Sequence, residues 1–216
     1  MSIVSSRDRL TEPLLALTFD DGPSPQTPDI LDLFREHHGH GTFFVLGESV
    51  EGREEILART LAEGHEIGNH SFSHPHAMHR TDDELAHDIA RCQRLLGHGP
   101  RLFRPPYGEE PVRTARIAEE RLLPTTVLWS VDPSDWLERD PQAIAASIID
   151  GLAPGAIVDL HDGWPRHTST PADRTPTVEA LRIALPEIGR LGYRCVTVSE
   201  LLKGLSDERA RGIPPA

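Results

Sequence analysis

The sequence predicts a single α/β domain in which about seven parallel strands and their connecting helices form a closed or nearly closed barrel. Short apolar runs alternate with amphipathic stretches along nearly the whole chain of 216 residues, and this alternation is typical of a parallel sheet built from β/α units. No glycine-rich dinucleotide-binding pattern follows the first run, which favours a barrel over an open nucleotide-binding sheet.

Each short apolar run is an expected strand, and no linker, composition break or long-period repeat divides them. The expected strands are Leu14–Phe19, Thr42–Leu46, Glu66–Gly68, Leu102–Phe103, Thr126–Val131, Ala156–Leu160 and Arg194–Val198. Thr81 with Glu84 three residues later is a capping-box pattern that starts a helix. The expected helices are one from Thr27 with Ile30, Leu31, Leu33 and Phe34 on its apolar face, Val50–Ala62, one from Thr81, Pro111–Leu123, Asp140–Gly151 and Thr175–Leu191.

The ends of the chain are expected to lie outside the barrel. Residues 1–13 are expected to form an N-terminal extension and residues 204–216 a loosely held C-terminal tail, which leaves residues 14–203 as the barrel domain. The stretch from Asp162 to Arg174 is a long loop after a strand end, so it could border a functional site.

The composition excludes several classes of protein. Hydrophobic residues make up 38% and charged residues 26% of the chain, as in soluble globular proteins. The net charge of -12 repels phosphate backbones, so nucleic acid is not expected as a partner. Cys92 and Cys195 lie on separate expected elements without a CxxC pair, which indicates two buried thiols rather than a disulfide framework.

The chain start has neither the basic residues nor the apolar run of a signal peptide. No stretch reaches the ~20 apolar residues of a membrane-spanning helix. These features predict a cytoplasmic protein without a membrane span, and they leave the oligomeric state open.

Two adjacent carboxylates, Asp20 and Asp21, directly follow the first expected strand. Taken alone, they are as compatible with a simple turn as with a site, because Asp-Gly-Pro is good turn chemistry. After the third strand, His70 and His74 lie four residues apart and point the same way if the segment is helical. Such a pair can share a divalent metal, although further histidines nearby leave a polar loop as the alternative.

The later strand ends carry further polar residues. Arg104 is the only charge in the stretch after the fourth strand, where prolines stiffen the turn; a surface arginine is the alternative. After the fifth strand come Asp132 and Asp135, for which a turn or helix cap is the alternative. Along the sixth strand, alternation places Asp159 and His161 on one face, and this face points into the barrel mouth if the other packs against helices.

Five polar clusters at five strand ends are better explained as parts of one site than as unrelated surface residues, because those ends converge in a barrel. One aspartate and two histidines supply a metal site with positions open for water and substrate. A second carboxylate and a separate histidine supply a general base and a general acid. The sum predicts metal-assisted hydrolysis.

The ordered motifs TFDDGP, HSFSH, RPPYG, DPSDW and IVDLHD resemble those of the polysaccharide deacetylases, carbohydrate esterase family four. The resemblance runs from about Leu14 to Leu202. It implies a distorted (β/α) barrel and a metal-dependent hydrolase that removes an N-acetyl or other small N-acyl group from a sugar or sugar-like substrate. The metal implied is divalent and usually zinc, with cobalt or nickel as alternatives.

The resemblance also implies the residues of the site. Asp21, His70 and His74 would hold the metal, and Asp20 would be the general base that activates water there. Arg104 would hold Asp20 in its ionised form, and the Tyr107 backbone N–H would help stabilise the oxyanion. His161 would be the general acid, with Asp135 favouring its protonated form.

The substrate-binding residues are expected to be Asp159, Trp136, Trp164 and Pro106. Aromatic faces stack on sugar rings, although ordinary burial is an even alternative for each tryptophan; Trp129 is expected in the core. Asp159 departs from the family, which usually has leucine there to line the acyl pocket. The pocket is therefore expected to be altered, unless Asp159 pairs with an arginine such as Arg104 or Arg166.

Two other functions are weighed against this one. Asp159 and the absence of a signal peptide would suit an intracellular deformylase or amidase that acts on a small non-polymeric amide. An inactive sugar-binding module would be expected to lack at least one of the catalytic or metal-binding residues, and all of these are present.

Overall fold

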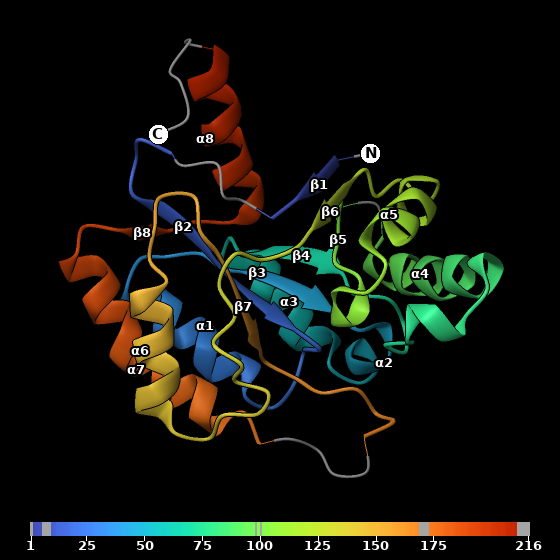
Figure 1. Cartoon of the computed structure of the whole chain (residues 1–216). Helices are drawn as coiled ribbons and strands as arrows, with labels where there is room; N and C mark the ends of the chain where they lie inside the picture. Colours follow the sequence, from blue (N-terminus) through green and yellow to red (C-terminus); the bar gives the residue numbers. More distant parts are fainter. Residues whose placement is uncertain (1, 6–9, 98, 100, 169–172, 211–216) are drawn as a thin grey trace.

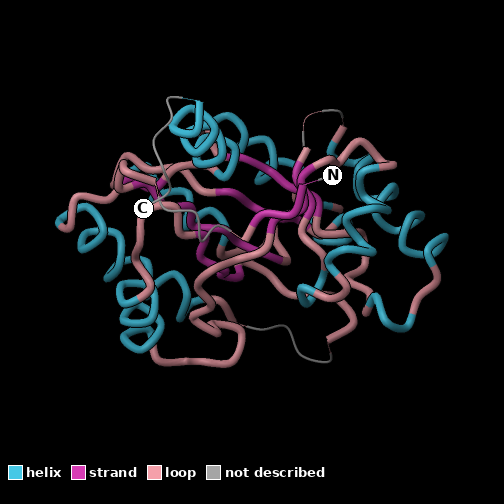
Figure 2. Tube along the Cα trace, turned by 45° about the horizontal axis from the view of Figure 1, so that its top comes forward, coloured by secondary structure: helices cyan, strands magenta, loops and turns pink. Residues whose placement is uncertain are grey.

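The computed structural model describes residues 2–5, 10–97, 99, 101–168 and 173–210. Its centre is a parallel sheet with helices packed around it (Figures 1 and 2), so the expected barrel of β/α units is confirmed. The described strands are β1 (Ser2–Val4), β2 (Leu14–Asp20), β3 (Thr42–Val45), β4 (Glu66–Asn69), β5 (Leu102–Phe103), β6 (Thr125–Val127), β7 (Ile157–His161) and β8 (Arg194–Cys195). They are arranged in the order β1-β6-β5-β4-β3-β2-β7, and β8 pairs with β2.

The barrel is distorted because its closure between β6 and β7 is incomplete. The expected strand Thr126–Val131 pairs as a strand only over Thr125–Val127. The chain then leaves β6 and reaches β7, where Val131 and Val158 form an isolated parallel bridge and the Asp159 N–H donates to the Val131 carbonyl at 2.9 Å. A single bridge takes the place of a full ladder there, and it leaves that side of the barrel open to loops.

Most helices begin where the sequence places them. The helices are α1 (Thr27–Glu36), α2 (Gly47–Val50), α3 (Glu54–Ala62), η1 (Ala77–His79), α4 (Asp82–Leu96), η2 (Pro106–Gly108), α5 (Pro111–Glu119), α6 (Pro141–Asp150), α7 (Thr175–Arg190) and α8 (Val198–Ala210). The Thr81 capping box of α4 is complete. The expected helix Val50–Ala62 is instead split into α2 and α3, because Gly52 between them has a φ of 80° that a right-handed helix does not allow.

Alternation along β2 divides the core into two layers. Leu15, Leu17 and Phe19 share a cluster with residues of α1, α6 and α7, which lie on one side of the sheet (Figure 1). Leu14 and Ala16 face the barrel interior in a second cluster. The next residues on the interior face are Thr18 and Asp20, so the interior changes from apolar to polar towards the carboxyl ends of the strands.

The two chain ends belong to the fold more than the sequence indicates. β1, within the expected extension, pairs with β6, and α8 continues into the expected tail as far as Ala210. Leu201 and Leu205 of α8 are buried in the interior cluster, so α8 covers the amino-terminal end of the barrel. Residues 1, 6–9 and 211–216 lie outside the described part of the chain.

The seventh expected strand is also shorter than predicted. It was expected over Arg194–Val198, but β8 ends at Cys195. Thr197 then caps α8: its hydroxyl accepts from the Glu200 N–H at 3.2 Å, and the Glu200 carboxylate accepts from the Thr197 N–H at 3.0 Å. This reciprocal cap starts the helix and ends the strand.

The described residues also show the state of the two cysteines and the character of the helices. Cys92 and Cys195 are both free and buried. No helix in the described ranges combines the length and the apolar character needed to cross a bilayer.

The packing of α8 predicts that Leu201→Ala destabilises the protein by about 2–5 kcal/mol, because it deletes a fully buried leucine and leaves a cavity. The exposed neighbour Lys203 provides the control, and Lys203→Ala is expected to change stability by less than about 0.5 kcal/mol. Urea unfolding followed by circular dichroism measures both. Equal, small effects would mean that α8 is not part of the cooperative core.

Candidate active site

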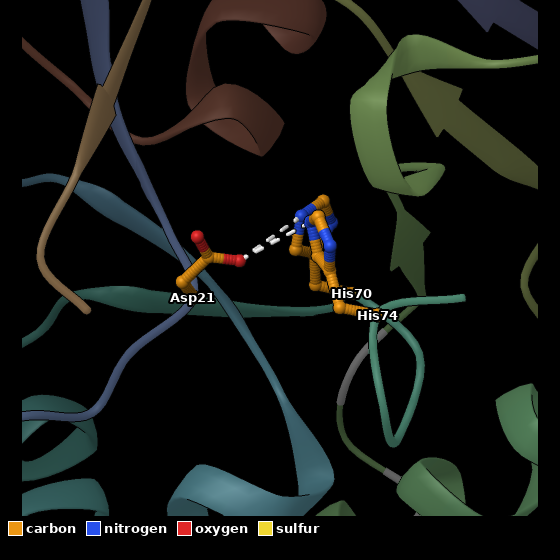
Figure 3. Close-up of side chains that lie close together, drawn as sticks. All are labelled: Asp21, His70 and His74. Carbon is orange, nitrogen blue, oxygen red and sulfur yellow. Dashed lines mark ion pairs between the residues drawn. The ribbon is translucent and has the colours of Figure 1, made fainter. Parts of the chain in front are cut away.

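Asp21, His70 and His74 converge at the carboxyl ends of β2 and β4 (Figure 3). Asp21 Oδ1 lies 3.7 Å from His70 Nε2 and 3.4 Å from His74 Nε2. All three side chains are buried, and one ligand atom from each lies within 4.8 Å of the others. The three residues that the sequence groups as metal ligands are therefore brought together.

The two histidines converge without a helix. Their four-residue spacing would point both rings the same way if the segment were helical, whereas Ser71–His74 is an irregular loop with a positive φ at Ser71 (72°) and at His74 (55°). Asp21 also has a positive φ, 74°. Left-handed backbone at three non-glycine residues is sparsely populated and clusters at functional sites, and here it turns these side chains into the barrel mouth.

The donor set fits a divalent cation. Asp21 Oδ1 is buried without a hydrogen-bond partner. His70 Nδ1 lies 2.8 Å from the Arg104 carbonyl oxygen, which requires a proton on Nδ1 and leaves the Nε2 lone pair free. Burial, together with the neighbouring histidines, holds the pKa of His74 well below its ordinary value, so His74 is neutral, as a ligand must be.

Electrostatics favours a cation at the same place. Burial raises the pKa of Asp21, because an ionised carboxylate in this setting lacks compensation. The cationic groups near Asp20, Asp21 and Asp159 are the buried guanidiniums of Arg104 and Arg174 and the protonated ring of His161. Arg104 is already paired with Asp20 and Asp159, and a divalent cation at Asp21 Oδ1 would favour the ionised carboxylate of Asp21.

Arg104 connects the carboxylates on the barrel interior. It is 0% exposed, and its Nη1 donates to Asp20 Oδ1 at 2.8 Å, Asp159 Oδ1 at 2.7 Å and Thr18 Oγ1 at 2.8 Å. The guanidinium also lies over the Phe44 ring, 4.2 Å from its centroid. Asp159 thus pairs with Arg104, whereas Arg166 pairs with Glu51.

Asp20, Asp159 and His161 form a second set of close potential ligand atoms. The Arg104 guanidinium already lies within hydrogen-bonding distance of both carboxylates, and its positive charge opposes a second cation there. This set is therefore better suited to proton transfer than to metal binding.

His161 is held by Asp135. Its Nδ1 lies 2.8 Å from Asp135 Oδ1, and its backbone N–H donates to Asp135 Oδ2 at 2.9 Å. Burial alone would lower the pKa of His161, but the charge and hydrogen bond of Asp135, with smaller contributions from Asp159 and Asp21, raise this pKa to about 10. His161 is therefore protonated at neutral pH, with Nε2–H directed to the cavity as a proton donor.

A cavity of about 440 Å³ contains these groups. Its lining residues are Asp20, Asp21, His70, His74, Tyr107, Trp129, Asp132, Trp136, Asp159, His161, Trp164, Pro165, Thr168 and Arg174. Trp136 and Trp164 both line it, and Trp136 is 54% exposed. Pro106 is buried and is not among the lining residues, whereas its neighbour Tyr107 is.

Tyr107 lies at the rim of the cavity in a strained conformation. Its φ is 58°, and Gly108 after it also has a positive φ, 64°. The Tyr107 ring lies parallel to that of His76, with centroids 3.9 Å apart, and edge-on to that of His74 at 4.3 Å. These contacts fix a backbone turn beside the two candidate ligands.

Sequence reasoning missed three residues that shape the site. Trp129 was expected in the core, but it lines the cavity as well as packing against the interior cluster. Arg174 is buried, and its guanidinium donates to the Gly163 carbonyl at 2.7 Å; no local pattern singles it out in its loop. Asp162 directly follows His161, so its position after a strand could have marked it; burial raises its pKa to about 7.

A (β/α) barrel with an Asp-His-His set, a paired carboxylate and a protonated histidine at its carboxyl end defines a metal-dependent hydrolase. A family model described as polysaccharide deacetylase matches residues 7–123. A peptidoglycan-N-acetylglucosamine deacetylase of Bacillus cereus is 40% identical over 201 residues, which cover 89% of this chain and 89% of that protein.

Two further relatives are also named as deacetylases of acetylated sugars or peptidoglycan. A chitooligosaccharide deacetylase of a Bradyrhizobium species is 36% identical over 195 residues, covering 86% of this chain and 89% of the relative. The solved structure of the peptidoglycan deacetylase PdaC from Bacillus subtilis matches with a TM-score of 0.79 and 33% identity, covering 94% of this chain and 96% of that one.

The chain belongs to the polysaccharide deacetylase family. It is a metal-dependent deacetylase, a hydrolase of C–N bonds other than peptide bonds.

The Asp135–His161 pair predicts a measurable titration. Because the pKa of His161 in the folded protein, about 10, lies above its ordinary value of 6.5, the protonated ring contributes stability that is complete below pH 6.5 and is lost as the pH rises through about 10. In Asp135→Asn the largest contribution that raises the pKa of His161 is lost, so this pKa is expected to fall.

NMR titration of the His161 ring in metal-free protein measures this change. Asp150→Asn, which removes an exposed carboxylate on α6, should leave the midpoint unchanged. A midpoint that stays near 10 in Asp135→Asn would show that another group holds the proton on His161.

Proposed function

We propose that the protein removes N-acetyl groups from N-acetylglucosamine residues of a glycan, with Zn²⁺ as its metal. The observation that carries this proposal is the grouping of Asp21, His70 and His74 beside Asp20 and His161 at one cavity. The names of the relatives support the sugar: one acts on peptidoglycan N-acetylglucosamine and one on chitooligosaccharides. The partly exposed Trp136 at the cavity supports it too, since aromatic faces stack on sugar rings.

Asp21, His70 and His74 would hold the metal. When bound, the metal supplies Lewis-acid polarisation of the acyl carbonyl and lowers the pKa of a water molecule at the site. Two imidazoles and one carboxylate suit zinc in a catalytic site with open positions, and cobalt or nickel could take the same donors.

Asp20 is the proposed general base. Its Oδ1 is held by Arg104 at 2.8 Å, while its Oδ2 lies 3.4 Å from His70 Nε2, beside the place where the metal would bind. Asp20 takes a proton from the attacking water as the water oxygen bonds to the acyl carbon. The arginine donates a charge-assisted hydrogen bond to the carboxylate and fixes its direction.

His161 is the proposed general acid. Its Nε2 proton passes to the amide nitrogen as the C–N bond breaks, so the sugar leaves as an amine and the acyl group as acetate. Asp135 positions the ring and favours its charged form. The backbone N–H of Tyr107 would stabilise the negative charge that develops on the acyl oxygen, and a metal held by Asp21, His70 and His74 would add positive charge there.

The pairing of Asp159 with Arg104 bears on the alternative of a small-amide deformylase. A buried carboxylate without a partner would call for a cationic or strongly hydrogen-bonding substrate group. Asp159 Oδ1 accepts a hydrogen bond from Arg104 at 2.7 Å, and burial together with the charge of Asp20 raises the pKa of Asp159 well above its ordinary value. Asp159 therefore does not need a cationic group from the substrate, and the acetylated glycan is favoured. The cytoplasmic location expected from the sequence stays a prediction.

The activity is tested by stripping the protein of metal, restoring Zn²⁺ and measuring released acid on N-acetylglucosamine oligomers, the monomer and their N-formyl counterparts. Zinc-dependent acetate release from the oligomers is expected. Asp20→Asn should lower the rate by about 10²–10⁴-fold, because it removes the general base. Asp29→Asn, an exposed aspartate on α1, is the control. Formate release alone, or no release with metal bound, would overturn the proposed substrate.

Asp159 is expected to influence which acyl group is accepted, because it lines the cavity. In Asp159→Leu, Arg104 keeps Asp20 and Thr18 as partners, and the new apolar surface favours a methyl group. The ratio of acetate to formate release is expected to rise about tenfold, the usual effect of one methyl group in an apolar pocket. An unchanged ratio would exclude Asp159 from the acyl pocket.

A further inference from the structure

The backbone N–H groups of the loop that carries the two histidines are bound by side chains, whereas the carbonyls of Ser71 and Phe72 accept from the N–H groups of Gly47 and Glu48 at 3.1 and 3.0 Å. The Ser71 N–H donates to Asn69 Oδ1 at 2.8 Å, and the His74 N–H donates to Ser71 Oγ at 3.1 Å. The N–H groups of Phe72 and Ser73 donate to Asp88 Oδ1 at 2.8 and 3.1 Å. The four consecutive backbone donors of Ser71–His74 are thus bound by side-chain oxygens and not by a helix or strand.

Asp88 differs from the other two anchors of this loop. Asn69 and Ser71 are parts of the same stretch of chain, whereas Asp88 lies on α4 and is charged. Its second oxygen, Oδ2, accepts from the Ser73 hydroxyl at 2.8 Å. One carboxylate therefore receives three hydrogen bonds from two adjacent residues, and bonds to an ionised acceptor are about twice as strong as neutral ones.

The loop needs such an anchor because its backbone is strained. Ser71 and His74 both have positive φ values, and each such conformation costs of order 1–3 kcal/mol unless its surroundings hold it. Asp88 binds the two residues between them. Without it, Phe72 and Ser73 have no fixed partner for their N–H groups, and the turn can relax towards ordinary backbone angles.

His74 is the side chain most exposed to such a change. His70 is oriented independently by the hydrogen bond between its Nδ1 and the Arg104 carbonyl. His74 Nδ1 is buried without a hydrogen-bond partner, so its ring is held by the backbone of the loop and by packing against Tyr107 and His70. A small movement of the loop would carry His74 Nε2 away from Asp21.

We propose that Asp88 is a positioning residue of the metal centre: by holding the Phe72–Ser73 turn it sets the place of His74 and thereby the affinity for the metal. The inference rests on the proposed assignment of Asp21, His70 and His74 as ligands. Asp88 itself does not contact the metal, the substrate or the reacting atoms. It acts through the loop alone.

The test is the dissociation constant for Zn²⁺, measured by competition with a chromogenic chelator. Asp88→Ala is expected to weaken zinc binding by about 10–100-fold, the usual effect of losing a partner that orients a ligand. Asp83→Ala, which removes an exposed carboxylate from the same helix, should leave the affinity unchanged. Asp88→Asn keeps an oxygen for both N–H groups and should recover most of the loss.

A double-mutant cycle separates positioning from general destabilisation. In a His74→Ala background the ligand is already gone, so Asp88→Ala should weaken zinc binding little further. If circular dichroism shows Asp88→Ala to be unfolded, Asp88→Glu, which displaces the carboxylate by one methylene, replaces it and is expected to weaken binding.

The outcomes distinguish this inference from the proposed function. Unchanged zinc affinity in the folded Asp88 variants, or equal losses in Asp88→Ala and Asp88→Asn, would overturn the positioning by Asp88 and leave the metal site standing. A wild-type chain that binds no zinc would overturn the proposed metal centre itself.

Discussion

The candidate site depends on the buried residue Arg104. The Arg104 side chain pairs with Asp20 and Asp159, and the Arg104 backbone carbonyl orients His70. This one residue, which directly follows β5, therefore joins the proposed base to a proposed metal ligand. A buried charge is tolerated only when it is paired, and removing one partner of such a pair typically costs about 3–5 kcal/mol. The carboxylates and the arginine therefore stabilise one another.

Neighbouring groups at the barrel mouth have their pKa values shifted in opposite directions. Burial raises the pKa of Asp21 and lowers that of His74, which prepares a neutral imidazole and a carboxylate that gains from a cation. Asp135 acts against burial and raises the pKa of His161. Groups of the same chemical type are thus directed to metal binding or to proton transfer by their neighbours, as is common in active sites.

The precision of the site comes from irregular segments rather than from the sheet. β2 and β7 deliver Asp20 and His161 on the interior face, but Asp21, His74 and Tyr107 reach the cavity through left-handed backbone. Such segments cannot hold themselves. They are held by side chains from other elements, among them Asp88 of α4 for the histidine loop and His76 for the turn at Tyr107.

The sequence by itself determined the β/α order, the capped starts of α4 and α6, and the polar residues that meet at the strand ends, because periodicity, capping and alternation are local properties. It also indicated that Asp159 and His161 share a face, which follows from the pleat alone. Tertiary structure decided that Asp159 pairs with Arg104, that α8 covers the barrel, and that Trp129 and Arg174 join the cavity. These outcomes depend on contacts between residues far apart in the chain, which no local pattern encodes.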